Sequence, residues 1–353
     1  MIWLNAVLAG LVAASVCAAA ADEARVDEIR ERLVHANAWR DHVMIVAHRA
    51  GGLQRGKTRF AENSLAATRN AIALGAEMIE IDVQKSKDGA YVVFHDSWLN
   101  RTSTCKGRLA EKTLAELKTC RLIVEGTGAI ADEFVPTLRD VLTVTRNRIF
   151  VNIDNKLDPV DLRGIVAVGR DLGMADQLVI KQNLWSSQKV AEAVAMIDTV
   201  GPGPMFMPII ADDAVRDARF LEAVTRAVSA DAVELIAWRS DGGSMADTGG
   251  PLFGARVRAV AARGDWHLWV DTYAIVNKAG GTLARGRGDE LAVIAGLPQE
   301  TYGFWAEQGA TMIQTDEPEA AMAWLSANGY RVPYASEIRA GELSHAAEVA
   351  AGQ

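Results

Sequence analysis

Residues 78–96, M-I-E-I-D-V-Q-K-S-K-D-G-A-Y-V-V-F-H-D, contain two short apolar runs that carry or lead into charged and imidazole side chains. An apolar run that ends in a charged residue is typical of a buried strand whose C-terminal tip enters an active site. The linker 85–89 is too short for a helical crossover between parallel strands. Its Asp-Gly pair is a hairpin turn signal, so we expect the second run to fold back and bring His95 near Asp82.

Short apolar runs recur along the chain and alternate with helical patterns, which predicts a parallel α/β architecture. The nine runs are 43–47, 78–83, 91–94, 149–153, 178–180, 205–210, 233–237, 267–270 and 311–314. A closed barrel has eight strands, so one run needs another explanation. Either 91–94 is the returning strand of the hairpin or 233–237 is peripheral. We expect a distorted (β/α)8 TIM barrel rather than an open doubly wound sheet, because no nucleotide-binding glycine motif occurs.

The composition is that of a globular protein with a sizeable core. The chain has 353 residues, of which 50% are hydrophobic and 23% charged, and its formal net charge is −8. This length suits one large domain or two modest ones. There is no basic run, so we expect no nucleic-acid partner.

The N-terminus and the cysteines point to export. Residues 1–20 contain no charged side chain and end in A-A-A at 18–20, which is typical of a signal peptide and its cleavage site. A membrane anchor or acylation at Cys17 is the alternative. Removal of the leader leaves Cys105 and Cys120, and an even pair in an exported protein predicts a disulfide. Two unrelated buried thiols are the other interpretation. We expect a periplasmic or secreted protein.

The predicted organisation is a leader (1–20), an N-terminal helix (21–42), a barrel domain (43–334) and a C-terminal tail (335–353). Within the barrel, an insertion at about 96–148 follows the strand that ends at His95, and it holds a possible helix from Thr113 to Lys118. A segment of this length after an active-site strand commonly covers the pocket. The glycine-rich stretch 240–254 is interpreted as a mobile loop.

Eight motifs, taken in order and with their spacing, carry a family resemblance. They are A-H-R-A-G at 47–51, A-E-N-S at 61–64, G-A-E-M-I-E-I-D-V at 75–83, K-D-G-A-Y-V-V-F-H-D at 87–96, L-N-R-T-S at 99–103, V-N-I-D-N-K at 151–156, a tryptophan strand at 267–271 and Q-T-D-E-P at 314–318. With them, the chain resembles the glycerophosphodiester phosphodiesterase family from about residue 43 to 325. That family's fold is a TIM barrel related to phosphatidylinositol-specific phospholipase C.

The resemblance implies that His48 and His95 are the catalytic pair. Imidazole titrates near neutral pH, so one ring can activate a hydroxyl or water while the other protonates the leaving alcohol. Which ring does which stays open. Arg49 and Lys156 would hold the non-bridging phosphate oxygens. Trp269 packs either against the glycerol of the substrate or into the core.

The resemblance also implies one divalent cation. Glu80 and Asp82 would bind it, and Asp154 stands where the family usually has a third, glutamate ligand. Glu80 and Asp82 are two residues apart and share one face of a strand. Hard oxygen ligands suit Mg²⁺ or Ca²⁺ rather than zinc. Aspartate shortens the third ligand by one methylene, so we expect an altered metal preference or a bridging water.

Other positions have two interpretations or depart from the family pattern. Ala50 stands where the family's H-R-G motif has glycine, so we expect the turn to bend slightly later, from Gly51 onward. Glu62 and Asn63 either orient functional side chains or cap a helix. Asp316 is interpreted first as a helix N-cap.

The implied activity is metal-dependent hydrolysis of glycerophosphodiesters to glycerol 3-phosphate and an alcohol, either by water or through a cyclic phosphate. One alternative is a lysophospholipase D or another lipid-headgroup phosphodiesterase, which wide access through 96–148 and 240–254 would favour. Another is a non-catalytic barrel, which the intact set of reactive groups disfavours. We expect a small-molecule partner and no membrane span after leader removal, and the sequence does not predict the oligomeric state.

Overall fold

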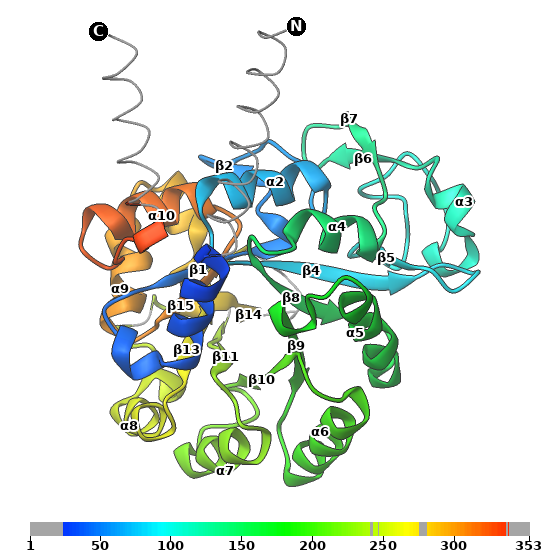
Figure 1. Cartoon of the computed structure of the whole chain (residues 1–353). Coiled ribbons are helices and arrows are strands. Elements are labelled where there is room, and N and C mark those ends of the chain that lie inside the picture. The colour runs from blue at the N-terminus through cyan, green and yellow to red at the C-terminus, as the bar shows by residue number, and fades with distance from the viewer. Residues whose placement is uncertain (1–23, 241–242, 246, 275–280, 337, 339–353) are drawn as a thin grey trace, which may run out of the picture.

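The structure, a computed structural model, describes residues 24–240, 243–245, 247–274, 281–336 and 338. In this part of the chain eight parallel strands close into a barrel, which confirms the predicted TIM-barrel fold (Figure 1). They are β1 (Met44–Ala47), β4 (Met78–Lys85), β8 (Phe150–Asn155), β9 (Leu178–Asn183), β10 (Met205–Ala211), β11 (Ala232–Ile236), β13 (His267–Asp271) and β15 (Met312–Thr315). Because β1 pairs with both β15 and β4, the ring of strands is closed.

The extra apolar run, 91–94, forms β5 (Tyr91–Val93), which is the returning strand of a hairpin. It pairs antiparallel with the outer end of β4, where Val83 lies opposite Val93. The Phe94 amide donates to the Asp82 carbonyl at 2.9 Å. The predicted hairpin is therefore confirmed. The alternative, a peripheral 233–237 run, is wrong, because β11 lies between β10 and β13 in the barrel.

Helices cover the outside of the barrel (Figure 1). They are α2 (Leu65–Leu74), α4 (Leu138–Thr145), α5 (Leu162–Asp171), α6 (Ser187–Val200), α7 (Ala218–Val228), α8 (Ala255–Gly264), α9 (Tyr302–Glu307) and α10 (Pro318–Ala327). Each buries one face; in α5, Leu162, Ile165 and Val166 are buried at helical spacing. Shorter helical turns are η1 (Ala36–Trp39), η2 (His48–Ala50), η3 (Leu109–Glu111), η4 (Pro159–Asp161), η5 (Ala175–Gln177), η6 (Pro251–Phe253), η7 (Leu283–Gly286), η8 (Glu290–Ile294) and η9 (Pro298–Glu300). Small ladders join β2 (Leu53–Gln54) to β3 (Lys57–Thr58) and β12 (Arg239–Ser240) to β14 (Gly281–Thr282).

Alternation along the strands separates an outer core from an inner one. In β1, Ile45 and Ala47 pack toward the helices, whereas Met44 and Val46 belong to a cluster inside the barrel. That cluster also contains Met78, Phe150, Val179, Met207, Trp269 and Met312, together with Val26, Ile29 and Leu33 from a helix at 24–34. The apolar layer fills the N-terminal end of the barrel, so polar residues farther along the same strands lie toward the C-terminal end.

The segment after β5 forms a small subdomain beside the barrel (Figure 1). It contains the predicted helix, α3 (Leu114–Leu117), which has Thr113 as its N-cap, and the hairpin of β6 (Arg121–Val124) and β7 (Ala129–Phe134). The predicted disulfide between Cys105 and Cys120 is present, with an S–S distance of 2.09 Å. The subdomain has its own apolar cluster, which includes Leu99, Leu109, Leu117 and Leu122. It is shorter than the expected 96–148, because α4 packs on the barrel like the other outer helices.

Several sequence-based expectations fall partly or wholly outside the described residues. The leader 1–20 lies outside them, as does almost all of the tail 335–353 and part of the glycine-rich stretch 240–254. The helix expected at 21–42 is described from residue 24 and ends at 34, before η1. Among the described helices, none has the length and apolar character needed to span a membrane.

Candidate active site

The first motif forms a strained turn at the end of β1. Arg49, Ala50 and Gly51 are consecutive left-handed residues with φ of 48°, 69° and 77°. The turn therefore begins at Arg49, and the expectation that it bends only from Gly51 is wrong. Gly51 is required sterically as well, because a Cβ there would lie 2.8 Å from Pro318 Cγ. With this turn, the Arg49 amide reaches Glu80 while the His48 ring reaches Asp316.

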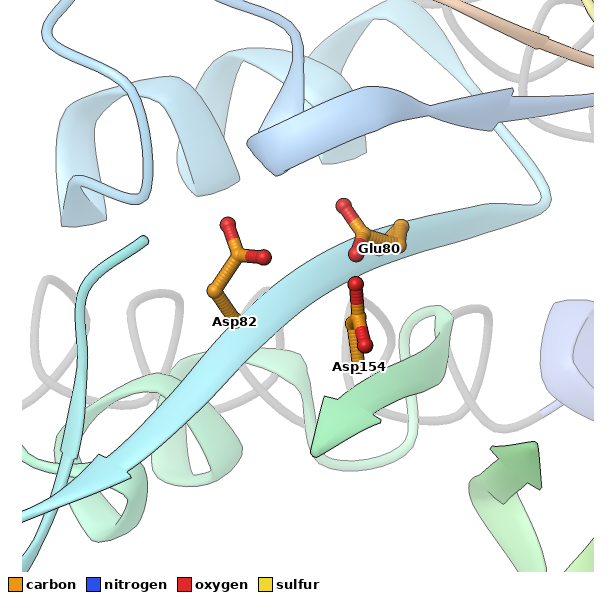
Figure 2. A group of neighbouring side chains, drawn as sticks. All are labelled: Glu80, Asp82 and Asp154. Carbon is orange, nitrogen blue, oxygen red and sulfur yellow. The ribbon is translucent and has the colours of Figure 1, made fainter. Parts of the chain in front are cut away.

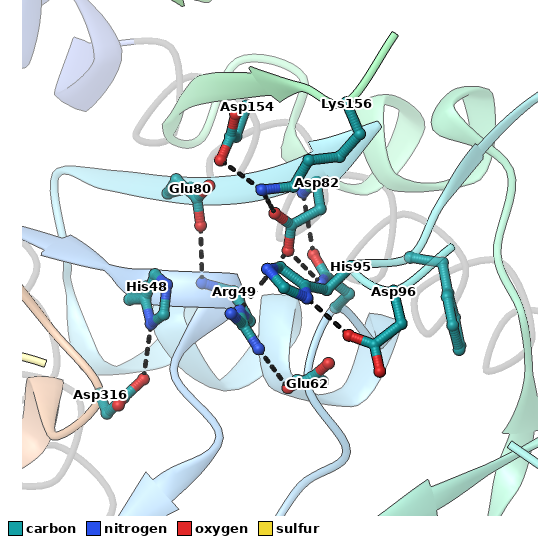
Figure 3. A network of polar contacts seen from close by, with 12 residues as sticks. His48, Arg49, Glu62, Glu80, Asp82, His95, Asp96, Asp154, Lys156 and Asp316 are labelled. Carbon is teal, nitrogen blue, oxygen red and sulfur yellow. Dashed lines mark hydrogen bonds and ion pairs between the residues drawn. The ribbon is translucent and has the colours of Figure 1, made fainter. Parts of the chain in front are cut away.

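His48 is held by the carboxylate of Asp316 (Figure 3) and by an aromatic ring. Its Nδ1 lies 2.8 Å from Asp316 Oδ1, and its ring stacks on Tyr273 with centroids 3.7 Å apart. Burial alone would lower the pKa of His48, but the charge of Asp316 raises it above its usual value. The bond at Nδ1 leaves Nε2 for a ligand in the pocket that His48 lines.

Asp316 corrects the N-cap interpretation. The N-cap position of α10 is Glu317, and neither it nor Asp316 caps the helix with its side chain. Asp316 instead reaches the end of β1, because β15 is the neighbour of β1 in the barrel. The Q-T-D-E-P motif was the available signal for this role.

His95 has a similar arrangement at the end of the hairpin. Its Nδ1 lies 2.7 Å from Asp96 Oδ1. Asp96 is in turn held by Arg101, whose Nε donates to Oδ2 at 2.7 Å and whose Nη2 donates to Oδ1 at 2.8 Å. The Arg101 hydrogen bonds, with burial opposing them, lower the pKa of Asp96 to about 2. The site thus has two imidazoles, each with a carboxylate at Nδ1.

Three carboxylates gather on β4 and β8, where Asp82 lies opposite Asp154 in the strand register (Figure 2). One oxygen from each of Glu80, Asp82 and Asp154 lies within 4.8 Å of the others. Burial and then repulsion from Asp82 raise the pKa of Glu80 to about 7. Two buried like charges in contact are costly without a cation, so the cluster favours binding of positive charge.

Both predicted phosphate-binding cations lie beside this cluster. Lys156 Nζ contacts Asp154 Oδ2 at 2.6 Å and Asp82 Oδ1 at 2.9 Å. Arg49 Nε lies 3.6 Å from Asp82 Oδ2, and its backbone amide donates to Glu80 at 3.0 Å. Burial opposes ionisation of Asp82, but the charges of Lys156 and Arg49 hold its pKa below its usual range. Asp82 is therefore ionised next to two cations that can also face a phosphate.

The carboxylate cluster fits a divalent cation. Oxygens that share one Ca²⁺ lie at most about 5 Å apart, since each is about 2.4 Å from the ion, and the three carboxylates meet that limit. Each carboxylate oxygen has two lone pairs, so the contacts of Asp82 and Asp154 with Lys156 leave acceptor capacity. An all-oxygen set suits Mg²⁺ or Ca²⁺.

The A-E-N-S motif positions this machinery. Glu62 accepts from Arg49 Nη1 at 2.8 Å and from Arg101 Nη2 at 2.7 Å, so it orients both arginines. The Asn63 amide donates to Asp82 Oδ2 at 2.7 Å. Ser64, not Glu62 or Asn63, caps α2 by accepting from the Ala67 amide. Of the two interpretations of Glu62 and Asn63, the structure supports the orienting one.

The pocket has a volume of about 310 Å³, and it is lined by seven of the eight residues predicted to act in catalysis, metal binding or phosphate binding. His48, Arg49, Glu80, Asp82, His95, Asp154 and Lys156 all line it. Trp269 does not: it is fully buried in the inner apolar cluster, and its Nε1 donates to Asp271 Oδ1 at 3.0 Å. Of the two interpretations of Trp269, core packing is therefore the one that the structure supports. On β13 this residue belongs to the apolar layer at the N-terminal end of the barrel.

Sequence reasoning missed a second polar pair in the pocket. Lys181 on β9 donates to Glu234 on β11 at 3.1 Å, and both side chains are almost completely buried. Burial opposes the charge of Lys181, but Glu234 and Asp154 keep its pKa above its usual value. The signal was present, since each residue stands in or directly after an apolar run. Lys181 adds a third cation near the carboxylate cluster.

A model of the glycerophosphoryl diester phosphodiesterase family matches residues 48–320. The chain belongs to this family. A glycerophosphodiester phosphodiesterase of Caldanaerobacter subterraneus is 36% identical over 123 residues, which cover 35% of this chain and 49% of that protein. The chain thus spans about half the length of this curated relative.

Solved structures of this family share the fold. A glycerophosphoryl diester phosphodiesterase from Parabacteroides distasonis matches with a TM-score of 0.60 and 21% identity, over 88% of this chain and 93% of that one. A phosphodiesterase of Oleispira antarctica, solved with its product sn-glycerol-3-phosphate, matches with a TM-score of 0.52 and 19% identity, over 80% and 96%. At these identities the likeness establishes the barrel fold.

Proposed function

We propose that this chain hydrolyses glycerophosphodiesters to glycerol 3-phosphate and an alcohol in a reaction that depends on one divalent cation. The observation that carries the proposal is the joint position of two carboxylate-bound histidines, His48 and His95, beside the acidic cluster in one pocket. Family membership and the curated glycerophosphodiester phosphodiesterases among the relatives support the substrate class. The Oleispira antarctica phosphodiesterase was solved with sn-glycerol-3-phosphate, which is the product that we propose for this chain.

The positive groups of the site would hold the phosphate. Glu80, Asp82 and Asp154 would bind Mg²⁺ or Ca²⁺, which supplies concentrated positive charge for the non-bridging oxygens. Arg49 and Lys156 would donate hydrogen bonds to the same oxygens. Burial strengthens these interactions, since Asp82 and Glu80 are each only 1% exposed.

The two histidines would divide the proton transfers. One takes the proton of the attacking O–H at its Nε2 as the new P–O bond forms, and the other gives a proton to the alcohol oxygen as the old P–O bond breaks. Asp316 and Asp96 would hold the rings in the tautomer with hydrogen on Nδ1. The attacking group is either water or the 2-hydroxyl of the glycerol. Phosphorus NMR under single-turnover conditions decides, because only the second route gives a cyclic phosphate.

The alternatives have less support. The described residues that line the pocket itself include none from 96–148 or 240–254, so the pocket gives no specific support to a lysophospholipase D. A non-catalytic barrel would not need two imidazoles that are each held by a carboxylate. We keep glycerophosphodiesters as the proposed substrates.

The export of the protein and its domain boundaries are also proposals. We propose a leader at 1–20, a barrel domain at 43–334 and a periplasmic or secreted protein. The disulfide between Cys105 and Cys120 supports this, since such bonds persist in oxidising compartments.

A substrate panel tests the proposal. Purified protein is assayed on glycerophosphocholine, glycerophosphoethanolamine and a lysophospholipid, with Mg²⁺ or Ca²⁺ and with EDTA. We expect release of glycerol 3-phosphate from the first two, its loss in EDTA, and loss of at least about a hundredfold in His48→Ala and His95→Ala. Hydrolysis of the lysophospholipid alone would replace the proposed substrate class. Absence of any hydrolysis would refute the proposal.

A further inference from the structure

A second hollow, of about 640 Å³, adjoins the candidate active site. Asp213 and Trp238 line both the hollow and the pocket, so the two spaces meet at these residues. The hollow lies on the loops that follow β10 and β11. A smaller space of about 110 Å³ lies beside His48 and Arg49 at the end of β1, across the barrel. The larger hollow therefore has room for the bulkier of the two groups that flank a phosphodiester.

Positive charge dominates the larger hollow. Three guanidinium groups line it, those of Arg216, Arg239 and Arg285, against the carboxylates of Asp212 and Asp213. Asp212 is already engaged, because it accepts from the Trp238 amide at 3.1 Å and from Arg285 Nη1 at 3.3 Å. A ligand that enters the hollow thus meets more cations than anions.

Arg239 and Arg285 have donors to spare. Among the described residues, the buried Nε of each has no hydrogen-bond partner. Within the described part of the chain, Arg239 otherwise donates over long distances, to the Gly243 carbonyl at 3.3 Å and to Thr282 Oγ1 at 3.5 Å. The described residues therefore leave hydrogen-bonding capacity on both guanidinium groups.

The backbone makes room for these two arginines. A Cβ at Gly286 would lie 2.8 Å from Arg239 Cζ, and one at Gly250 would lie 2.9 Å from Arg285 Nη1. Arg285 itself has a φ of 50°, and Ala284 before it has 49°. Such a conformation is unfavourable for residues other than glycine. Arg285 Nη1 also donates to the carbonyl of Trp238, which lines both the hollow and the pocket, at 3.2 Å.

We propose that this hollow is an anion subsite for the alcohol part of the substrate, which would carry a carboxylate or a second phosphate. The inference rests on the proposed function and names the substrate class. A guanidinium donates two parallel hydrogen bonds to either anion. Arg239 and Arg285 supply two such groups next to the site where the phosphodiester would bind.

Two diesters that differ by one carboxylate test the subsite. Glycerophosphoserine is glycerophosphoethanolamine with an added carboxylate, and kcat/KM is measured for both with the full protein and its divalent cation. We expect the wild type to prefer the serine diester by about tenfold or more, which corresponds to one charge-assisted hydrogen bond. Arg239→Gln should lower this preference by about tenfold through KM. Arg219→Gln, on the exposed surface of α7, is the matched control and should keep the preference.

Each outcome has a defined meaning. Hydrolysis of both diesters at equal efficiency, or an unchanged preference in Arg239→Gln, would overturn the subsite and leave the proposed function standing. A preference for the ethanolamine diester would indicate a cation subsite instead. If inorganic phosphate binds less tightly to Arg239→Gln while the wild type shows no preference, the hollow takes a free anion and the inference fails. Hydrolysis of neither diester would refute the proposed function itself.

A measurement on the wild type covers the case in which Arg239→Gln does not fold. Phosphoserine and phosphoethanolamine are compared as inhibitors of glycerophosphocholine hydrolysis. The subsite predicts an inhibition constant about tenfold lower for phosphoserine. Equal inhibition by the two compounds would overturn it.

Discussion

Replacing Asp316 by asparagine tests how the first histidine is held. Asp316 Oδ1 lies 2.8 Å from His48 Nδ1, and the two side chains are only 17% and 6% exposed. The aspartate accepts from Nδ1–H and stabilises the imidazolium that forms when the ring holds a second proton. Asparagine keeps the shape but is neutral, and it can present its amide group to Nδ1 and favour the other tautomer.

The structure sets the size of the effect. A buried hydrogen bond to a charged group contributes about 1.5–3 kcal/mol, so kcat should fall roughly ten- to a hundredfold with a smaller change in KM. Burial lowers the pKa of His48 and the charge of Asp316 raises it, with a net increase. Asp316→Asn removes the raising effect. The limb of the pH–rate profile that His48 controls should move to lower pH, whether the ring acts as acid or base.

The assay is the release of glycerol 3-phosphate from glycerophosphocholine between about pH 5 and 9, a range that spans the usual pKa of histidine. Asp198→Asn is the matched control, because Asp198 is an exposed residue of α6. A pH profile that stays in place in Asp316→Asn, together with a loss of kcat below about threefold, would refute this account of His48.

Further predictions concern stability. Replacing Cys105 and Cys120 by alanine frees a 15-residue loop and should lower the free energy of unfolding in urea by about 3 kcal/mol; no loss would contradict this. Ala50→Gly relieves a left-handed residue and should raise the free energy of unfolding by about 0.5 kcal/mol, whereas Ala191→Gly, in the exposed face of α6, should lower it by about 1 kcal/mol; equal effects would contradict the strain. Burial and then the charge of Asp316 raise the pKa of Asp289 to about 7. Protonated Asp289 contributes stability that is fully present below about pH 4 and is lost as the pH rises toward 7. The free energy of unfolding of the wild type should therefore fall relative to that of Asp289→Asn over this pH range. A difference that does not change with pH would argue against it.

Local patterns in the sequence predicted the barrel, and the residues at the ends of its strands, together with the motifs of the family that the chain resembles, predicted most of the site. Strand alternation places Glu80 and Asp82 on the inner face above Met78, and the hairpin brings His95 beside them. The same alternation, applied to β9 and β11, points Lys181 and Glu234 inward. Neither residue lies in one of the eight motifs, so the predicted site did not include them.

Other features depend on contacts between distant residues. Asp316 reaches His48 across 268 positions, because the last strand of the barrel closes against the first. The Q-T-D-E-P motif marks the position of Asp316, but the motif by itself does not distinguish that role from a helix cap. Trp269 shows the opposite error: strand alternation gives its face, but its depth depends on where β13 begins in the barrel. The left-handed conformation of Ala50 was likewise not predictable from a residue that rarely adopts it.

The most direct test of the central claim is the initial rate of glycerol 3-phosphate release from glycerophosphocholine as Mg²⁺ or Ca²⁺ is returned to chelator-treated protein. Wild type is measured beside Asp154→Asn, which keeps the size of the side chain and removes its charge from the acidic cluster. We predict no release without the cation, a saturable rise on its return, and a higher cation requirement in Asp154→Asn. A rate that is the same with and without the cation would contradict the account.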